Sequence, residues 1–104
     1  MLKDLFLGFI KIHILYHAAQ EPICGVEVLQ ELQRHGYRLS PGTVYPTLHR
    51  LARDGYLTQH RKVVDSKVRK YYTITDQGLA TLGEARAKKA ELVNEVMEEG
   101  RDTQ

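Results

Sequence analysis

The sequence of residues 39–57 predicts a short helix whose start, end and two faces follow from the residue types alone. Ser40 followed by Pro41 marks the start, because the serine hydroxyl can cap free backbone N–H groups and a proline at the first helical position loses no hydrogen bond. Asp54 and Gly55 mark the end. At about 100° per residue, the apolar positions form one narrow stripe. This stripe, which we expect to pack on a core, consists of Val44, Leu48 and Leu51.

The opposite face of this helix carries side chains that suit a nucleic acid. On or beside it lie Gly42, Thr43, Pro46, His49, Arg50 and Arg53. A helix in the major groove needs donors for base edges and phosphates, whereas a core helix would not place two arginines and a histidine on one face. Such a face more often belongs to an amphipathic helix that simply meets water. The residues that follow the helix are therefore needed to distinguish a solvated helix from a DNA-binding one.

Two runs rich in Val, Tyr, Thr and Ile follow the helix. They span Leu57–Val64 and Val68–Thr75, with a polar turn at residues 65–67 between them, and this pattern predicts a β-hairpin. The hairpin carries more cationic side chains than solubility requires: His60, Arg61, Lys62, Lys67, Arg69 and Lys70. A basic hairpin beside such a helix can bind phosphates, so the combination predicts a winged helix-turn-helix.

The first predicted helix, about residues 2–19, is apolar over more than the usual third of its circumference. Its apolar positions are Leu5, Phe6, Phe9, Ile10, Ile12, Leu15 and Tyr16. One winged helix cannot bury all of them, so we expect a second contact surface, either a partner subunit or a ligand cavity. A second helix, about Gly25 to His35 with Gly36 as its stop, is the expected support helix.

The last predicted helix starts after the capping residue Thr75 and continues to about Met97. Apolar residues recur near heptad spacing at Leu82, Ala85, Leu92 and Val96. Lys89 interrupts this seam, which favours packing against the first helix in a two-subunit interface over an autonomous coiled coil. The expected interface residues are Leu5, Phe6, Phe9, Leu82, Leu92 and Val96.

Together these elements predict a mostly α chain with a small β-hairpin, an α+β fold. Residues 1–75 are the expected winged helix-turn-helix domain, and residues 76–104 the expected C-terminal dimerisation helix and tail.

Several runs resemble the PadR-type transcriptional regulators. They are Ser40–Leu48, Arg50–Leu51, Asp54–Leu57 and Arg69–Thr75 with Gly78. The resemblance covers nearly the whole chain, and the tyrosine–proline pair inside the helix is not explained by stability, because an interior proline costs about 3 kcal/mol. The resemblance implies a regulator, most often a repressor, that binds a near-palindromic operator as a homodimer. It also implies a short family member, with a single C-terminal helix that packs against the N-terminal helix.

Resemblance and helical geometry together indicate the DNA-binding residues. They are Thr43, Tyr45, Pro46, His49, Arg50 and Arg53 in the helix and Lys67, Arg69 and Lys70 in the wing. Arg50 is the residue expected to reach a guanine edge. Tyr45 lies at the flank, where a phenol can bond a phosphate or close the core, and both interpretations stay open. The wing tip lacks the glycine or proline of many family members, which leaves the depth of the wing in the groove open.

The distribution of charge supports a polyanionic partner. Residues 34–72 carry nine Lys or Arg against two acidic residues, whereas the remainder carries six against eleven. Double-stranded DNA is the expected partner. The alternative is a winged-helix interaction module whose basic face docks an acidic protein, and only sequence-specific competition separates the two. A membrane surface is disfavoured, because the basic region has no lysine-rich amphipathic helix with bulky apolar anchors.

The remaining chemistry-bearing residues predict neither catalysis nor a cofactor. Cys24 is the only cysteine, which excludes an intrachain disulfide and favours a buried thiol. His13 and His17 are spaced to share a metal, but no Glu, Asp or Cys nearby completes the usual ligands, so no metal site is expected. There is no phosphate loop, nucleophile elbow or carboxylate pair typical of an enzyme.

Two further expectations concern the chain's surroundings. The N-terminus lacks a signal-cleavage pattern and a stretch of about 20 uninterrupted apolar residues, so the protein is expected in the cytoplasm. Phe6, Phe9 and Tyr16 can line a small cavity or form dimer core, which leaves a small-molecule effector open.

Overall fold

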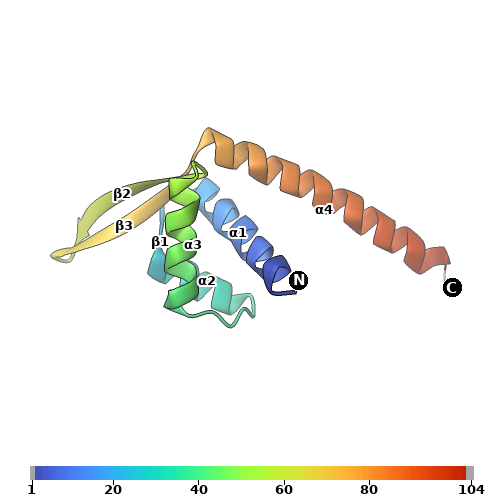
Figure 1. Cartoon of the computed structure of the whole chain (residues 1–104), viewed down its shortest axis with the longest axis horizontal. Coiled ribbons are helices and arrows are strands. Elements are labelled where there is room, and N and C mark those ends of the chain that lie inside the picture. Colours follow the sequence, from blue (N-terminus) through green and yellow to red (C-terminus); the bar gives the residue numbers. More distant parts are fainter. Residues whose placement is uncertain (1, 103–104) are drawn as a thin grey trace.

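The structure is a computed structural model that describes residues 2–102. Its elements are α1 (Leu2–Gln20), β1 (Ile23–Cys24), α2 (Gly25–Arg34), α3 (Pro41–Arg53), β2 (Leu57–Val64), β3 (Lys67–Ile74) and α4 (Asp76–Asp102). Residues 1, 103 and 104, which belong to the two expected domains, lie outside the described residues. The predicted α+β fold is confirmed, with a helix-turn-helix formed by α2 and α3 and a wing formed by β2 and β3 (Figure 1).

One apolar core holds the three N-terminal helices together. The predicted stripe of α3 faces this core, with Val44 and Leu48 fully buried. Ile14 of α1 and Leu32 of α2 pack into the same cluster, and Leu82 of α4 joins it with only 3% of its surface exposed. Because α3 is fixed by its inner face, its outer face is presented as a rigid surface.

The sheet contains a strand that the sequence did not indicate. The strand order is β1-β3-β2, all antiparallel, and Ile23 pairs with Tyr72 while Cys24 pairs with Tyr71. A two-residue strand has no visible alternation, which is why the sequence pattern missed it. Tyr72 is buried and Tyr71 only half-buried, as expected for neighbours on one strand. The expected burial of the Cys24 thiol is confirmed.

The hairpin closes with a tight turn at Asp65 and Ser66. Both residues have positive φ, 52° and 65°, the backbone conformation of a two-residue hairpin turn. Val64 therefore pairs directly with Lys67, so β3 begins one residue earlier than the predicted Val68.

Helix α4 begins as predicted and extends to Asp102 rather than Met97. Its start is capped by Thr75, whose hydroxyl oxygen accepts a hydrogen bond from the Gly78 N–H at 3.1 Å. Figure 1 shows α1 beside the first part of α4, while the rest of α4 runs away from the body on the side opposite the wing. Within residues 2–102, no helix combines the length and apolar character needed to cross a bilayer.

Candidate nucleic-acid interface

The outer face of α3 presents the side chains that the sequence analysis assigned to it. Five of them are exposed, namely Tyr45, Pro46, His49, Arg50 and Arg53, and Thr43 is half-buried. Ser40 occupies the N-cap position with extended backbone, but its hydroxyl makes no capping bond. Instead, the backbone N–H groups of Thr43 and Val44 donate to the Ser40 carbonyl oxygen.

Thr47 is a polar residue on the inner face of α3. It is fully buried, and its hydroxyl donates a hydrogen bond of 2.7 Å to the Thr43 carbonyl oxygen. This bond satisfies the hydroxyl within the helix, next to the position where Pro46 supplies no backbone N–H. Thr47 therefore supports the helix from inside and does not belong to its outer surface.

A groove beside α3 brings three elements together. It is lined by Cys24, Gly25 and Val26 at the start of α2, by Tyr45, Pro46 and His49 of α3, and by Val68, Arg69, Lys70 and Tyr72 of β3. Figure 1 shows the hairpin leaving one end of α3 and projecting away from α4. The structure thus places the predicted wing residues Arg69 and Lys70 across a shared groove from the outer face of α3. Lys67 is exposed near the tip of the hairpin.

The start of α2 belongs to this groove, although the sequence analysis did not include it. Gly25 is buried beneath the ring of Tyr45, and a Cβ added to Gly25 would overlap the ring atoms Cδ1 and Cε1. Tyr45 remains 45% exposed. Its ring therefore forms a wall of the groove rather than closing the core. No pattern in the sequence signals this contact, because the two residues meet only through the packing of α2 against α3.

Cationic side chains face each other across the two wing strands. Arg61 lies opposite Lys70, and Lys62 lies opposite Arg69. Like charges in directly opposed positions destabilise a hairpin, so this arrangement does not serve the stability of the isolated chain. A polyanion bound to the wing would neutralise both pairs.

Two arginines near the end of α3 differ in their partners. The guanidinium of Arg53 donates hydrogen bonds of 3.0 and 3.4 Å to the two carboxylate oxygens of Asp54. This hydrogen bonding lowers the pKa of Asp54 and raises the pKa of Arg53. Arg50 makes no ion pair within the described residues. It is thus the arginine whose guanidinium is available to a ligand without breaking an existing bond.

The expected interface residues separate into two groups. Leu5, Phe6 and Phe9 on α1 and Leu92 and Val96 on α4 are all exposed. Leu82 is not, because its side chain lies in the core of the chain itself. Heptad spacing identified Leu82 as apolar but did not distinguish core from surface.

The aromatic residues considered for an effector cavity do not converge on one hollow. Phe6 borders a groove between α1 and α3. Tyr16 borders a separate hollow between α1 and α4.

Comparison with known proteins identifies the family. The model of the transcriptional regulator PadR-like family matches residues 14–84. The transcriptional regulator Rv3488 of Mycobacterium tuberculosis is 50% identical over 96 residues, which are 92% of this chain and 90% of that protein. A crystal structure of a PadR family transcriptional regulator from Eggerthella lenta is similar, with a TM-score of 0.78, 33% identity and coverage of 92% of this chain and 85% of that one.

A fold comparison adds a structure solved with nucleic acid. Bacillus subtilis PadR in complex with operator DNA has a TM-score of 0.65 and 24% identity, over 73% of this chain and 45% of that one, and it shares the winged-helix fold. Members of this family are regulators of transcription rather than enzymes. The chain belongs to the PadR-like family of transcriptional regulators.

Proposed function

We propose that this chain binds a specific DNA sequence as a homodimer and represses transcription by occupying a near-palindromic operator. The observation that carries the proposal is the groove in which the outer face of α3, the start of α2 and the basic wing meet. A helix that exposes donors on its outer face, beside a cationic hairpin, has the shape and charge needed for a DNA major groove and its flanking phosphates.

Each group of side chains has a separate role in this proposal. Arg50, which has no ion pair in the described chain, reads a guanine edge. Tyr45 and His49, which line the groove shared with the wing, contact the neighbouring backbone or bases. Lys67, Arg69 and Lys70 neutralise phosphates, because the wing strands hold them exposed.

The homodimer is supported by apolar surface on two adjacent helices. Helix α4 has 27 residues, and only its first part lies against the rest of the chain. Beyond that part, Leu92 is 59% and Val96 57% exposed, and Phe6 on α1 is 48% exposed. Apolar surface of this extent is typical of an interaction site, and a second copy of the chain offers a matching surface. A two-fold dimer then requires an operator with two-fold symmetry.

The decisive experiment first finds the DNA and then tests how it is recognised. Repeated selection from random duplexes should enrich a near-palindromic sequence. Fluorescence anisotropy then compares this sequence with a scrambled duplex over a salt series. We expect Arg50→Ala to weaken operator binding by about 1–3 kcal/mol with little effect on the scrambled duplex. Lys70→Ala should weaken both and reduce the salt slope by about 1.

Lys88→Ala is the matched control, since it also removes one exposed positive charge but lies on α4, away from the groove. It should leave both affinities unchanged. Equal and steeply salt-dependent binding to every duplex, with no enriched sequence, would contradict the proposal and favour an acidic protein partner. Repression itself is tested by a reporter gene under the selected operator, whose expression should rise when the regulator is removed.

A further inference from the structure

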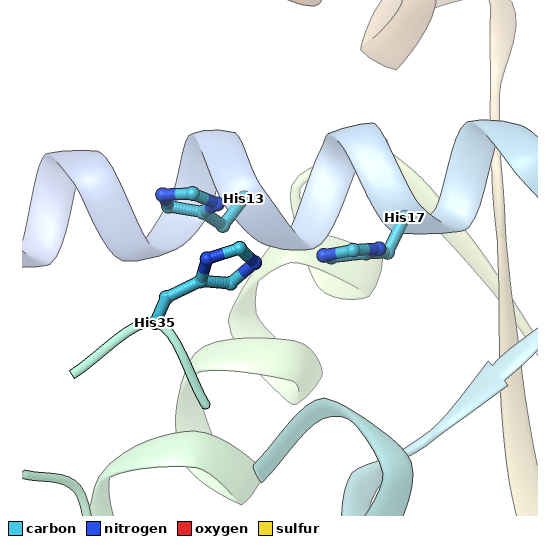
Figure 2. Close-up of side chains that lie close together, drawn as sticks. All are labelled: His13, His17 and His35. Carbon is cyan, nitrogen blue, oxygen red and sulfur yellow. The ribbon is translucent and has the colours of Figure 1, made fainter. Parts of the chain in front are cut away.

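Three of the five histidines meet where α1 lies beside the end of α2. His13 and His17 are one turn apart on α1, and His35 caps the C-terminus of α2. One ring nitrogen from each histidine lies within 4.8 Å of the corresponding nitrogens of the other two. Figure 2 shows the three rings turned toward a common point between the two elements. Residue spacing indicates only the α1 pair, because His35 joins it through tertiary packing.

The three imidazole rings lie in close proximity. The centroids of His13 and His35 are 5.0 Å apart with an angle of 30° between the ring planes, and those of His17 and His35 are 6.2 Å apart at 32°. The Nε2 atom of His17 is buried and has no hydrogen-bond partner in the described chain. A buried ring nitrogen without a hydrogen-bond partner is unfavourable. A bound group that accepts the nitrogen lone pair would remove this cost.

The surroundings of His13 favour its neutral form. Burial lowers the pKa of His13, and the neighbouring His35, His17 and Lys89 lower it further. A neutral imidazole keeps the lone pair that a metal ion needs. The Glu31 carboxylate oxygen lies 3.9 Å from His17 Nε2 and supplies the site with negative charge, part of which Arg34 already neutralises.

We propose that His13, His17 and His35 bind a divalent transition-metal ion of the zinc type. Imidazole nitrogen suits Zn²⁺, Cu²⁺ and Ni²⁺, and three histidines with one open position form a recognised kind of zinc site. Tetrahedral coordination at about 2.1 Å places ligand nitrogens about 3.4 Å apart, so small side-chain rotations must bring these three closer. All three histidines border one hollow between α1 and α4, which Tyr16, Arg86 and Lys89 help to line.

The proposed metal site lies between the segment that leads to α3 and the helix α1. His35 directly precedes Gly36, whose φ of 89° starts the segment leading to α3. The other two ligands belong to α1, which carries the apolar surface assigned above to the dimer. A bound ion would therefore brace the first helix against the end of α2.

Titration calorimetry of chelator-treated protein with Zn²⁺ tests the proposal, together with the visible absorption of bound Co²⁺. We expect one ion per chain. His13→Gln and His35→Gln should each weaken Zn²⁺ binding more than about 100-fold, since each removes a direct ligand. His60→Gln, a histidine on β2 outside the cluster, should leave the affinity unchanged. Lys89→Gln should strengthen binding about 3- to 10-fold by removing a nearby positive charge.

A second measurement avoids substitutions and their effects on folding. The imidazole NMR signals of His13, His17 and His35 should shift on addition of one equivalent of Zn²⁺ while those of His49 and His60 stay in place. The proposal is overturned if the signals of all five histidines shift alike. It is also overturned if the wild-type chain binds Zn²⁺ no more tightly than His35→Gln does, or if the wild type shows no binding.

Discussion

The contact between Gly25 and Tyr45 predicts that one methyl group will change stability with opposite sign in two backgrounds. Gly25 does not adopt a positive φ, so its backbone accepts an alanine without strain. With the tyrosine present, the Cβ of Gly25→Ala would occupy space that the ring fills. Because the ring is partly exposed, it can swing outward, and the substitution should displace the side chain rather than unfold the chain.

The size of the effect follows from the covered area of the ring. Tyr45 is 45% exposed, so displacement removes about half of its contact with the chain. For an aromatic residue that covers about 200 Å², half is about 100 Å², worth up to about 2.5 kcal/mol at about 25 cal/mol per Å². Alanine at a helical position raises the free energy of unfolding by up to about 1 kcal/mol relative to glycine. Gly25→Ala should therefore lower the free energy of unfolding by about 1–1.5 kcal/mol.

A double-mutant cycle measured by urea unfolding at fixed protein concentration tests this reasoning. In a Tyr45→Ala background the space above residue 25 is open, so Gly25→Ala should raise the free energy of unfolding by about 0.5–1 kcal/mol. On operator DNA, Gly25→Ala and Tyr45→Ala should weaken binding by a similar factor, about 10-fold, and the double variant no further. Stabilisation by Gly25→Ala in both backgrounds would refute the contact.

Substitutions at three other positions test the contact between the segment after α3 and the start of α4, and the proposed dimer. Thr75→Ala should lose about 1–2 kcal/mol of stability in urea, because the hydroxyl caps α4 and donates to the Gly55 carbonyl oxygen at 2.6 Å, and Thr75→Ser should retain most of it. Gly78→Ala should be destabilising by about 1–3 kcal/mol, since its Cβ would overlap the fixed Tyr56 carbonyl oxygen, and an unchanged urea midpoint would contradict that packing. Leu92→Asp should convert dimer to monomer in sedimentation velocity and abolish operator binding, and retained dimer-like affinity would contradict the proposed interface.

The elements with a strong periodic signal were predictable from the sequence. The inner stripe of α3 is buried as expected, and the hairpin strands lie within a residue of their predicted bounds. Thr75 caps α4 as its residue type indicated. In each case the interaction that forms the element is local in the chain, so residue spacing and propensity are enough to predict it.

The features that the sequence did not predict all depend on contacts between distant segments. Strand β1 exists only because β3 lies beside it. Leu82 belongs to the core because of the angle at which α4 leaves the wing, which heptad spacing does not encode. His35 completes the histidine cluster because the end of α2 packs near α1. Each of these requires the tertiary arrangement, whereas spacing within one helix shows only which residues share a face.

The joint between α3 and α4 links the proposed DNA surface to the proposed dimer helix. The Thr75 N–H donates to the Tyr56 carbonyl oxygen at 3.2 Å, and Gln77 Nε2 donates to the Asp54 carbonyl oxygen at 3.4 Å. The segment just after α3 is therefore hydrogen-bonded to the start of α4. In a dimer paired through α4, this joint sets the separation of the two recognition helices, which must match half-sites about 34 Å or a multiple apart. Loosening it with Thr75→Ala should consequently weaken binding to a full operator more than to an isolated half-site, although Thr75 touches no DNA in the proposed complex. Equal weakening on both duplexes would show that the joint only stabilises the fold.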